Sequence, residues 1–372
     1  MAGKRIVISA NAAWNIVNFR SGLVRGLQAA GHDVVAIAPP DGSVESVRAL
    51  GIPYHPIEMD KKGLSPAADL AVLMRYRRLL ASIGADVFLG YTVKPNIYGS
   101  LAAQSLGIRV VNNVSGLGTA FIRGGWLQRL VSILYKMALR RSSTIFFQNR
   151  DDRDLFLSKG LLRAEQARIL PGSGIDLARF TPPPPQSTQA SEPFRFLLVG
   201  RVIRDKGVLE YVDAARRLRA SCPTVRFQLL GPLDAENRTA IPAAEVEKWV
   251  GAGIVDYLGE AEDVRPFLGA ADCVVLPSYR EGLPRTLLEA AAMGRPLVAT
   301  DVAGCRDVVR EGINGFLCAP HDAVSLAGAM ERMLGLTGAE RARLGAASRA
   351  MVEAEYAEQR VVDSYLEAIE FG

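Results

Sequence analysis

The segment TPPPPQSTQASEP, residues 181–193, divides this chain of 372 residues near its middle. Four consecutive prolines and a polar tail interrupt both the helical and the strand period, because proline lacks an amide donor and continues neither element. The length also exceeds one ordinary hydrophobic core. We therefore predict an N-terminal domain over 1–180, a linker over 181–193 and a C-terminal domain over 194–352. A last helix within 353–372 is expected to pack back on the N-terminal domain.

On both sides of the linker, short apolar runs alternate with amphipathic helical patterns. Before it the runs are RIVISA, DVVAIAP, DVFLGY, RVVNNVS and TIFFQN; after it they are FRFLLVGRV, VRFQLLG, IVDYLG, CVVLPS and PLVATD. Such alternation predicts an α/β fold with two Rossmann-like, doubly wound parallel-sheet domains. Ligands bind such sheets at the carboxyl ends of the strands, so we expect the site in a cleft between the two halves.

Composition narrows the class of protein without choosing its ligand. Hydrophobic residues make up 49% and charged residues 22%, which is typical of a globular protein. The four cysteines form no CxxC pair, so a reducing, cytoplasmic compartment is expected. The N-terminus resembles a first strand more than a signal peptide, and no run of about 18 apolar residues is present. A net charge of +5 suits a phosphorylated ligand, anionic lipid or nucleic acid, but no basic-aromatic motif favours nucleic acid.

Two carboxylates eight positions apart stand out in EGLPRTLLEA, residues 281–290. On a helix this spacing separates them by roughly 80° and about 12 Å, so they cannot share a proton. Proline is favoured in a first turn, so a helix is predicted to begin near Leu283 or Pro284, with Glu281 before it and Glu289 inside it. The amide groups between the two acids would form an anion site. The plainer interpretation is a solvated loop acid and a helix-surface acid.

A second candidate follows the first strand of the C-terminal half, in GRVIRDKG. Gly200, Arg201 and Lys206 lie in the turn where this fold binds phosphate, and two cations there could neutralise a diphosphate. Ordinary loop charge is the alternative interpretation for either cation alone.

These motifs, together with LGEAEDV, EGLPRTLLEAAAMGRPLVATDVAG and NGFLCAP, resemble the retaining glycosyltransferases of family four, which have the GT-B fold. The resemblance implies that Arg201 and Lys206 hold the donor diphosphate, that Glu281 holds hydroxyls of the transferred sugar and that Glu289 holds the nucleotide ribose. It places Asp263 and Val264 beside the base. The other implied donor contacts are Gly200, Gly282, Leu283, Pro284, Arg285 and Thr286.

YTVKPNIYGS and NNVSGLGTAF in the first half resemble the subgroup that moves an N-acetylhexosamine from a UDP-sugar to polyprenyl-diphosphate-linked sugars. The acceptor candidates are Asn18, Arg20, Lys94, Ser115, Gly116, Leu117 and Gly118, with Arg20 offering a fork of donors to phosphate. The chain departs from many relatives in two ways. NNVSGLG lacks their histidine, and NAAWNIVNFRSG replaces their glycine-rich loop. His32, His55 and His321 are expected in surface turns.

The implied chemistry requires no cofactor and no metal. Prepositioned cations would stabilise the charge that develops on the leaving diphosphate. The one DxD spacing, Asp152 and Asp154, lies where a helix begins, and acids there suit the helix dipole better than a metal site. Retention could arise from a carboxylate nucleophile, whereas the resemblance implies same-face attack with the departing phosphate oxygen taking the acceptor proton.

The segment WLQRLVSILYKMALRR, residues 126–141, combines helical apolar spacing with basic residues, and RYRRLL from Arg75 adds more. It is either a core helix with snorkelling ends or a surface that binds the anionic cytoplasmic leaflet of the inner membrane. A transferase with a soluble acceptor remains an alternative, as does a nucleotide-sugar epimerase. A dinucleotide-dependent dehydrogenase is disfavoured, because GLGTAFIRG lacks the third glycine of that fingerprint.

Overall fold

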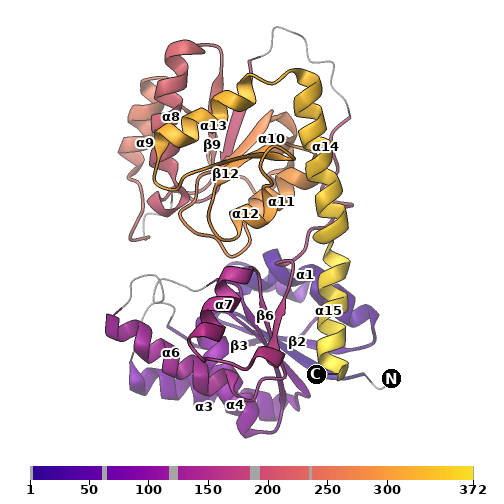
Figure 1. Ribbon diagram of the computed structural model, residues 1–372. Helices are drawn as coiled ribbons and strands as arrows, with labels where there is room; N and C mark the ends of the chain where they lie inside the picture. The colour runs from indigo at the N-terminus through magenta and orange to yellow at the C-terminus, as the bar shows by residue number, and fades with distance from the viewer. Residues whose placement is uncertain (1–2, 61–64, 117–124, 185–192, 234–236, 372) are drawn as a thin grey trace. The chain divides into compact units, whose positions relative to one another are not determined.

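The computed structural model describes residues 3–60, 65–116, 125–184, 193–233 and 237–371. The chain forms two compact units (Figure 1). The first comprises Met1–Gly174 and Glu358–Gly372, and the second comprises Ile175–Ala357. The chain therefore passes between the units at Gly174–Ile175 and again at Ala357–Glu358. Pro182, Pro183 and Pro184 lie in the second unit, so the first crossing precedes the predicted linker by several residues.

The first unit contains a seven-stranded parallel sheet in the order β3-β2-β1-β4-β5-β6-β7. Its strands are β1 (Arg5–Ser9), β2 (Asp33–Ala38), β3 (Tyr54–Pro56), β4 (Val87–Tyr91), β5 (Arg109–Val114), β6 (Thr144–Phe147) and β7 (Ala167–Ile169). Its helices are α1 (Ala13–Ala29), α2 (Val44–Arg48), α3 (Pro66–Ile83), α4 (Ser100–Ser105), α6 (Gly125–Leu139), α7 (Arg150–Ser158) and α15 (Glu358–Phe371). A π-helix, Pro95–Gly99, precedes α4, and a 3₁₀ helix, Ala164–Gln166, precedes β7.

The second unit contains a six-stranded parallel sheet in the order β10-β9-β8-β11-β12-β13. Its strands are β8 (Arg195–Val199), β9 (Arg226–Leu230), β10 (Asp256–Tyr257), β11 (Cys273–Leu276), β12 (Leu297–Thr300) and β13 (Gly315–Cys318). Its helices are α8 (Val208–Ser221), α9 (Ala243–Gly251), α10 (Arg265–Ala270), α11 (Arg285–Ala292), α12 (Cys305–Val308), α13 (Ala323–Leu334) and α14 (Gly338–Glu355), and a 3₁₀ helix spans Arg204–Lys206.

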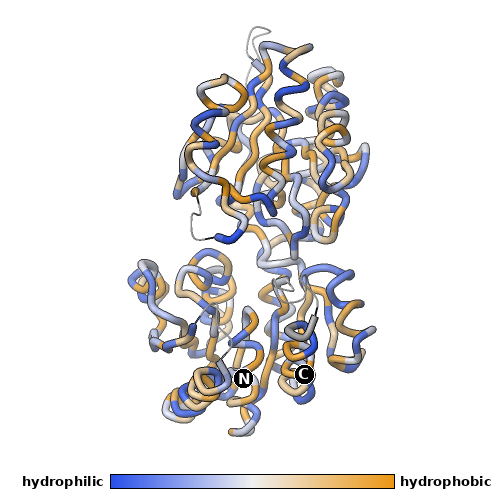
Figure 2. Tube along the Cα trace, turned by 90° about the vertical axis from the view of Figure 1, so that its left-hand side faces the viewer, coloured by the Kyte–Doolittle hydropathy of each residue, from blue (hydrophilic) through white to orange (hydrophobic). Residues whose placement is uncertain are grey.

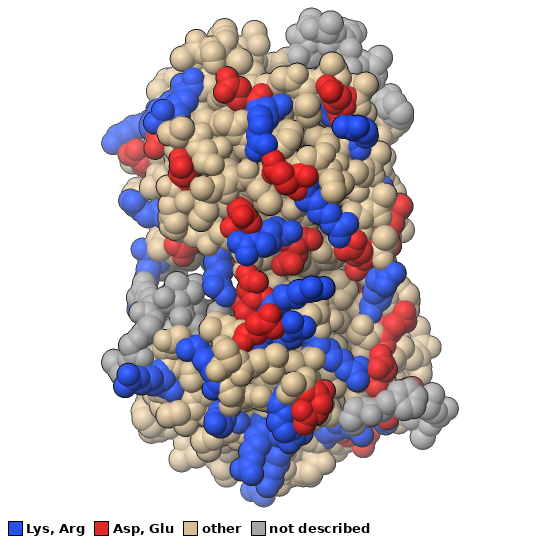
Figure 3. All heavy atoms as spheres, in the orientation of Figure 1, with Lys and Arg blue, Asp and Glu red and all other residues tan. Residues whose placement is uncertain are grey.

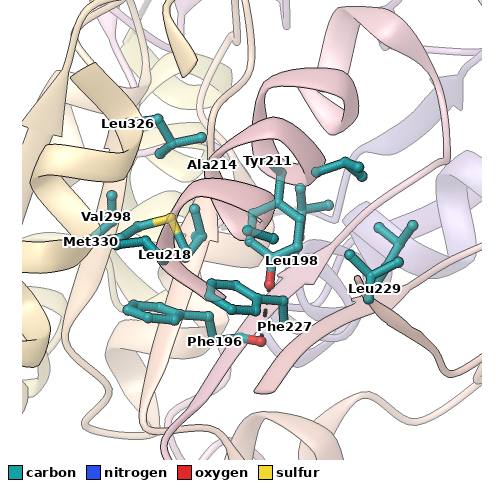
Figure 4. Packing of buried hydrophobic residues seen from close by; sticks show 14 of the residues in the cluster. Phe196, Leu198, Tyr211, Ala214, Leu218, Phe227, Leu229, Val298, Leu326 and Met330 are labelled. Carbon is teal, nitrogen blue, oxygen red and sulfur yellow. Dashed lines mark hydrogen bonds between the residues drawn. The ribbon is translucent and has the colours of Figure 1, made fainter. Parts of the chain in front are cut away.

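Alternate strand residues face opposite sides of each sheet, which is why both sides carry a core. In β1, Val7 packs with α3 and α6, whereas Ile6 and Ile8 pack with α1 and α15. The strands appear as orange tube inside each unit in Figure 2, and charged side chains of both signs are interspersed on the face in Figure 3. In the second unit, Phe196 packs with Tyr211 of α8, whose hydroxyl donates to the Phe196 carbonyl at 3.0 Å (Figure 4).

Helix ends follow the local sequence. Ser65 caps α3 ahead of Pro66, and Gly84 ends that helix at a φ of 69°. The Asn149 side chain caps α7 by accepting from the Asp152 amide at 2.8 Å, so Asp152 occupies the first turn as predicted. Asp154 lies two residues further along the helix and pairs with Arg153. No described helix is both long enough and apolar enough to cross a membrane.

Each sheet reverses its strand order once, and this reversal positions the candidate site. In the first unit the reversal lies between β1 and β4, and in the second it lies between β8 and β11. Loops that leave the carboxyl ends of two such strands diverge to opposite sides and leave room for a ligand between them. The predicted α/β fold with two doubly wound parallel sheets is confirmed.

Candidate functional site

The second unit brings the two strongest sequence candidates together at its reversal point. Lys206 follows β8, Glu281 follows β11, and the two strands are neighbours in the sheet. Lys206 Nζ lies 2.5 Å from Glu281 Oε1, with 24% and 13% of the two side chains exposed. Glu281 is therefore an acid held against a cation at the strand ends, not a solvated loop acid. Arg201 lies on the same β8 loop and is exposed.

Close backbone approach ties the β8 loop to the β11 loop. Gly207 has a φ of 69°, and a Cβ there would lie 2.0 Å from the carbonyl oxygen of Pro277. Only glycine combines that left-handed conformation with that contact. The Tyr279 amide also donates to the Asp205 carbonyl at 3.0 Å. The loop that carries Lys206 is thus held directly against the loop that carries Glu281.

The Tyr279 side chain also links the β11 loop to helix α8, which follows the β8 loop. Its hydroxyl donates to Glu210 Oε1 of α8 at 2.8 Å, and its ring lies 3.6 Å from the ring of His321. Burial and the Glu210 carboxylate raise the pKa of Tyr279. Sequence reasoning missed Tyr279 and assigned His321 only to a surface turn. Neither residue belongs to a recognisable motif, and their meeting depends on the order of strands in the sheet.

The other side of Glu281 is held by the turn after β12. Gly304 has a φ of 79°, and a Cβ there would lie 2.5 Å from the Gly282 carbonyl oxygen. The Glu281 amide donates to the Ala303 carbonyl at 3.4 Å. Backbone on both sides therefore restrains the position of Glu281.

Helix α11 begins at Arg285, one or two residues later than predicted. Pro284 is its N-cap in an extended conformation, with a φ of −74° and a ψ of 109°, and its side chain offers no capping group. Thr286 Oγ1 donates to the Val199 carbonyl at 3.4 Å, which links the first turn of α11 to the end of β8. The first turn of this helix, after Gly282 and Leu283, thus lies beside the strand that leads to Gly200.

Glu289 lies in the second turn of α11 with only 13% of its side chain exposed, so it is not a helix-surface acid. Arg285 Nε binds its Oε1 at 2.8 Å. Burial raises the pKa of Glu289, the nearby Arg285 and Arg179 oppose that shift, and Asp263 adds to it. Glu289 is thus a partly desolvated acid within an electrostatic cluster that includes Asp263.

Asp263 and Val264 precede α10, and Val264 is its N-cap. Arg265 donates to Asp263 through its backbone amide at 3.0 Å, through Nε at 2.9 and 3.1 Å and through Nη2 at 2.7 Å. These hydrogen bonds lower the pKa of Asp263 to about 2. A hollow of about 530 Å³ opens beside this pair; it is lined by Arg179, Thr181, Pro183, Arg195, Asp263, Arg265, Pro266, Gly269, Ala270 and Met293.

The acceptor candidates of the first unit follow its own strand ends. Asn18 is exposed on α1, where its Nδ2 donates to the Trp14 carbonyl at 3.0 Å. Ser115 and Gly116 follow β5 and are half-buried, whereas Leu117 and Gly118 lie outside the described residues. Lys94 Nζ binds Asp69 Oδ1 at 2.9 Å, with 14% and 9% of the side chains exposed. Lys94 is thus already paired inside the unit.

Arg20 differs most from its prediction. We expected Arg20 to offer a fork of donors to phosphate, but it is only 4% exposed and its guanidinium lies 4.1 Å from the centroid of the Tyr91 ring. Its position on the inner face of α1 explains the burial, since Ile16, Leu23 and Leu27 share that face. The charge therefore lies beneath the ligand edge of the sheet.

A buried amide network also escaped sequence reasoning. Asn112 Nδ2 donates to Asn96 Oδ1 at 2.9 Å and to Ser100 Oγ at 2.8 Å, and Ser142 Oγ donates to Asn112 Oδ1 at 2.6 Å. The network joins β5 to the π-helix and α4. The sequence signal for this network is the pair of asparagines, Asn112 and Asn113, inside the largely apolar run RVVNNVS. Thr92, between β4 and the π-helix, has a φ of 65°, which is strained for a β-branched residue.

No three His, Cys, Asp or Glu side chains gather as metal ligands among the described residues. The ligand edge of the second unit carries two cations, Arg201 and Lys206, the first turn of α11 and two partly buried acids, Glu281 and Glu289. That set of groups suits anion and hydroxyl recognition at one edge of a sheet.

Comparison with known proteins identifies the family. Residues 17–173 match a glycosyl transferase 4-like domain, and residues 193–335 match the glycosyl transferases group 1 domain. The chain is 27% identical to the N,N'-diacetylbacillosaminyl-diphospho-undecaprenol alpha-1,3-N-acetylgalactosaminyltransferase of Campylobacter jejuni over 97% of each chain. It is 24% identical to the UDP-Gal:alpha-D-GlcNAc-diphosphoundecaprenol alpha-1,3-galactosyltransferase of Escherichia coli, covering 78% of this chain and 75% of that one.

A solved glycosyltransferase from Rickettsia africae shares the fold, with a TM-score of 0.81 at 16% identity over 100% of this chain and 98% of that one. The two domain matches together span both structural units, in the same order along the chain. The protein is therefore an enzyme of the GT-B glycosyltransferases, with a glycosyl transferase 4-like domain followed by a group 1 domain.

Proposed function

We propose that the enzyme transfers an N-acetylhexosamine from a UDP-sugar to a polyprenyl-diphosphate-linked saccharide, with retention of configuration, during assembly of a surface or glycoprotein glycan. The Lys206–Glu281 pair at the ligand edge of the second unit carries this proposal, because it offers a cation for phosphate and an acid for sugar hydroxyls side by side. The full-length similarity to an N-acetylgalactosaminyltransferase named for a diphospho-undecaprenol acceptor supports the substrate class.

In the proposed donor complex, Arg201 and Lys206 hold the diphosphate, with Gly200, Pro284 and the backbone amides of Gly282, Leu283, Arg285 and Thr286 around it. Glu281 binds hydroxyls of the transferred sugar. Glu289 binds the ribose, and Asp263 and Val264 lie beside the base. The existing Lys206–Glu281 contact keeps both groups in place before the donor arrives, and preorganised charge is the usual source of transition-state stabilisation.

The proposed reaction breaks the bond between the anomeric carbon and the donor phosphate oxygen. The acceptor hydroxyl oxygen forms its bond on the same face of the sugar, and its proton passes to the departing phosphate oxygen. Lys206 and Arg201 stabilise the negative charge that grows on the diphosphate as the bond lengthens. Glu281, already engaged by Lys206, orients the sugar rather than acting as a nucleophile. We propose that no metal is needed.

The first unit is the proposed acceptor domain, with Asn18, Arg20, Lys94, Ser115 and Gly116 near its strand ends. Arg20 would contribute positive potential from a buried position rather than from a mobile surface side chain, whereas Lys94 is paired with Asp69 and would offer a hydrogen-bond donor. Low-dielectric surroundings screen such charges less than water does, which favours an anionic ligand such as a diphosphate.

We propose that α6 docks the enzyme on the cytoplasmic leaflet of the inner membrane, where a polyprenyl-linked acceptor resides. Val131, Tyr135 and Ala138 of α6 face the core, whereas Leu130, Ile133 and Met137 are exposed, by 38%, 57% and 55%. Arg129, Lys136, Arg140 and Arg141 beside them are also exposed. Figure 3 shows Lys and Arg side chains gathered on the lower part of the view, in the first unit, with Asp and Glu side chains beside them. An exposed apolar face with basic flanks is typical of interfacial helices.

The test of the proposed function is a two-step assay. A panel of nucleotide sugars is first screened for thermal protection of the enzyme, which identifies the donor. That donor is then supplied with and without a short-chain polyprenyl-diphosphate N-acetylhexosamine acceptor. We expect UDP release that depends on this acceptor. Turnover of the donor sugar without any acceptor would indicate an epimerase, and transfer only to a free saccharide would indicate a soluble acceptor.

A further inference from the structure

Arg20 is a buried cation without a carboxylate partner. Its Nη1 donates to the Phe19 carbonyl at 3.1 Å, and its Nε has no hydrogen-bond partner. No Asp or Glu forms an ion pair with it within the described part of the chain. Contact with the Tyr91 ring offsets only part of the cost of burying a guanidinium. Arg20 thus retains charge and a donor that an anion at the sheet edge could use.

The side chains of the cluster around Arg20 come from strands β4, β5 and β6 and from helix α15. Tyr91, beneath the guanidinium, is the last residue of β4. Tyr365 of α15 packs beside it with ring centroids 6.2 Å apart, and also packs on Phe146 of β6 at 4.9 Å. The Tyr365 hydroxyl accepts from Asn113 Nδ2 of β5 at 3.1 Å. Burial raises the pKa of Tyr365, and the positive charge of Arg20 opposes that shift, so this charge is felt at the phenol.

Two glycines on α1 allow α15 to come this close. A Cβ on Gly26 would lie 2.5 Å from Val362 Cγ1, and one on Gly22 would overlap the Glu358 carboxyl group. Gly22 and Gly26 are one helical turn apart on the same face of α1, whereas Arg20 lies on the face that carries Ile16, Leu23 and Leu27. The chain returns from the second unit to form α15, so residues more than 340 positions apart meet in this cluster.

We infer that Tyr365 of α15 is a positioning residue in the acceptor site, which holds Tyr91 and Arg20 in place for an acceptor diphosphate. This inference rests on the proposed acceptor role of the first unit. Tyr365 itself does not touch the ligand: its ring supports the Tyr91 ring, and this ring contact carries the positioning role. Removing the ring should let Arg20 shift without changing the donor site.

The test measures binding of N-acetylglucosaminyl diphosphofarnesol by calorimetry, with saturating UDP present to fill the donor site. We expect Arg20→Gln to weaken binding about tenfold and Tyr365→Leu at least fivefold. If Tyr365→Leu folds poorly, Tyr365→Met replaces it, because Met fills more of the space. We expect Tyr365→Met to weaken probe binding at least fivefold as well. Tyr365→Phe retains the ring and should stay within twofold of wild type. UDP affinity should stay within twofold for every variant.

Val362→Ala is the matched control, because it removes packing between α15 and α1 without touching Arg20. It should lower the melting temperature but leave probe binding unchanged. If Arg20→Gln weakens binding while Tyr365→Leu and Tyr365→Met match Val362→Ala, the positioning role is wrong and the acceptor assignment stands. If Arg20→Gln has no effect, or wild-type enzyme does not bind the probe, the acceptor assignment itself fails and takes this inference with it.

Discussion

Lys206 and Glu281 are 75 positions apart in the chain, yet they form a half-buried ion pair at the ligand edge of the second unit. Each charge is partly desolvated, so removal of one leaves the other uncompensated. The pair therefore has two roles to separate experimentally: it stabilises the folded loops, and it presents a cation and an acid to a donor. For variants at these two residues, both the stability of the fold and the turnover rate must be measured.

Lys206→Ala and Arg201→Ala should each reduce kcat/KM on the order of a hundredfold, or about 3 kcal/mol, because each removes a charge that stabilises the leaving diphosphate. Steady-state kinetics with the identified donor would measure this. Lys248→Ala is the matched control, since Lys248 is a 74% exposed lysine of α9 and should leave the rate unchanged. Wild-type rates in the double variant of Arg201 and Lys206 would refute the diphosphate assignment.

Glu289→Gln tests the environment of the second acid through pH. Burial raises the pKa of Glu289 in the folded protein, so the folded state favours its protonated form. The stabilisation is fully present below the unfolded pKa of roughly 4.3 and is lost as pH rises through the raised folded pKa. Glutamine does not ionise, so the Glu289→Gln variant does not lose stability in this way as pH rises. Its melting temperature relative to wild type should therefore increase from pH 4 to pH 7, measured by thermal denaturation; a difference independent of pH would contradict the buried acid.

At the scale of elements, the loops after β8, β11 and β12 are fixed by backbone contacts more than by side chains. Gly207 and Gly304 each have a positive φ, and each lies against a carbonyl of the loop that carries Glu281. The site residues are therefore mounted on turns that tolerate no Cβ. In contrast, α6 is fixed by its inner face only, and its outer apolar residues are exposed.

Gly207→Ala should destabilise the enzyme by more than the about 1–2 kcal/mol that a left-handed conformation alone costs, because its Cβ meets the Pro277 carbonyl. Gly312→Ala is the matched control: Gly312 has the same φ of 69°, and a Cβ there would meet no atom within 4 Å. Denaturant unfolding of both variants isolates the cost of the contact. Equal losses would show that the β8 loop adapts to a methyl group and that Gly207 is not required for its geometry.

Ile133→Ser with Met137→Ser should reduce the fraction of enzyme that floats with anionic liposomes, since less apolar area enters the interface. Lys136→Gln should weaken binding about fivefold, as one basic residue near anionic lipid contributes about 1 kcal/mol. Val324→Ser in α13 is the control, because Val324 is 61% exposed but lies in the second unit. Wild-type binding that is absent at low salt, or indifferent to anionic lipid, would reject membrane docking.

At the scale of the whole molecule, the chain builds two similar sheets and assigns them different chemistry. In the proposed function, the second unit supplies cations and acids to a nucleotide sugar, whereas the first supplies buried positive charge and an exposed amphipathic helix. The chain crosses twice between the units, and the second crossing returns α15 to the first unit, where it packs against α1. The last 15 residues thus belong to the fold of the first unit.

Transfer should survive a chelator, because the proposed diphosphate partners are cations of the protein itself. The measurement is the initial rate in EDTA, before and after addition of magnesium or manganese, with donor and acceptor otherwise unchanged. We expect the same rate in all three conditions. A rate that falls in EDTA and recovers with metal would mean that Arg201 and Lys206 do not suffice for the leaving group.

The sequence by itself determined the fold class, because the alternation of apolar runs and amphipathic segments is local and repeats throughout both halves. It also placed Lys206, Glu281 and Glu289 in their elements, since turn glycines, Pro284 and strand ends are local signals. Family membership followed from these motifs, and the comparisons confirmed it.

Only the tertiary structure decided which of these groups meet and which are buried. Arg20 was predicted as a donor to phosphate; it is buried against Tyr91 of β4, whose ring packs beside Tyr365 of α15. Tyr279 meets Glu210, and apolar residues of α6 remain exposed, for the same kind of reason. The unit boundary at Gly174–Ile175 also depends on contacts, not on the prolines that follow it. Burial is set by partners distant in the chain, and no local period encodes them.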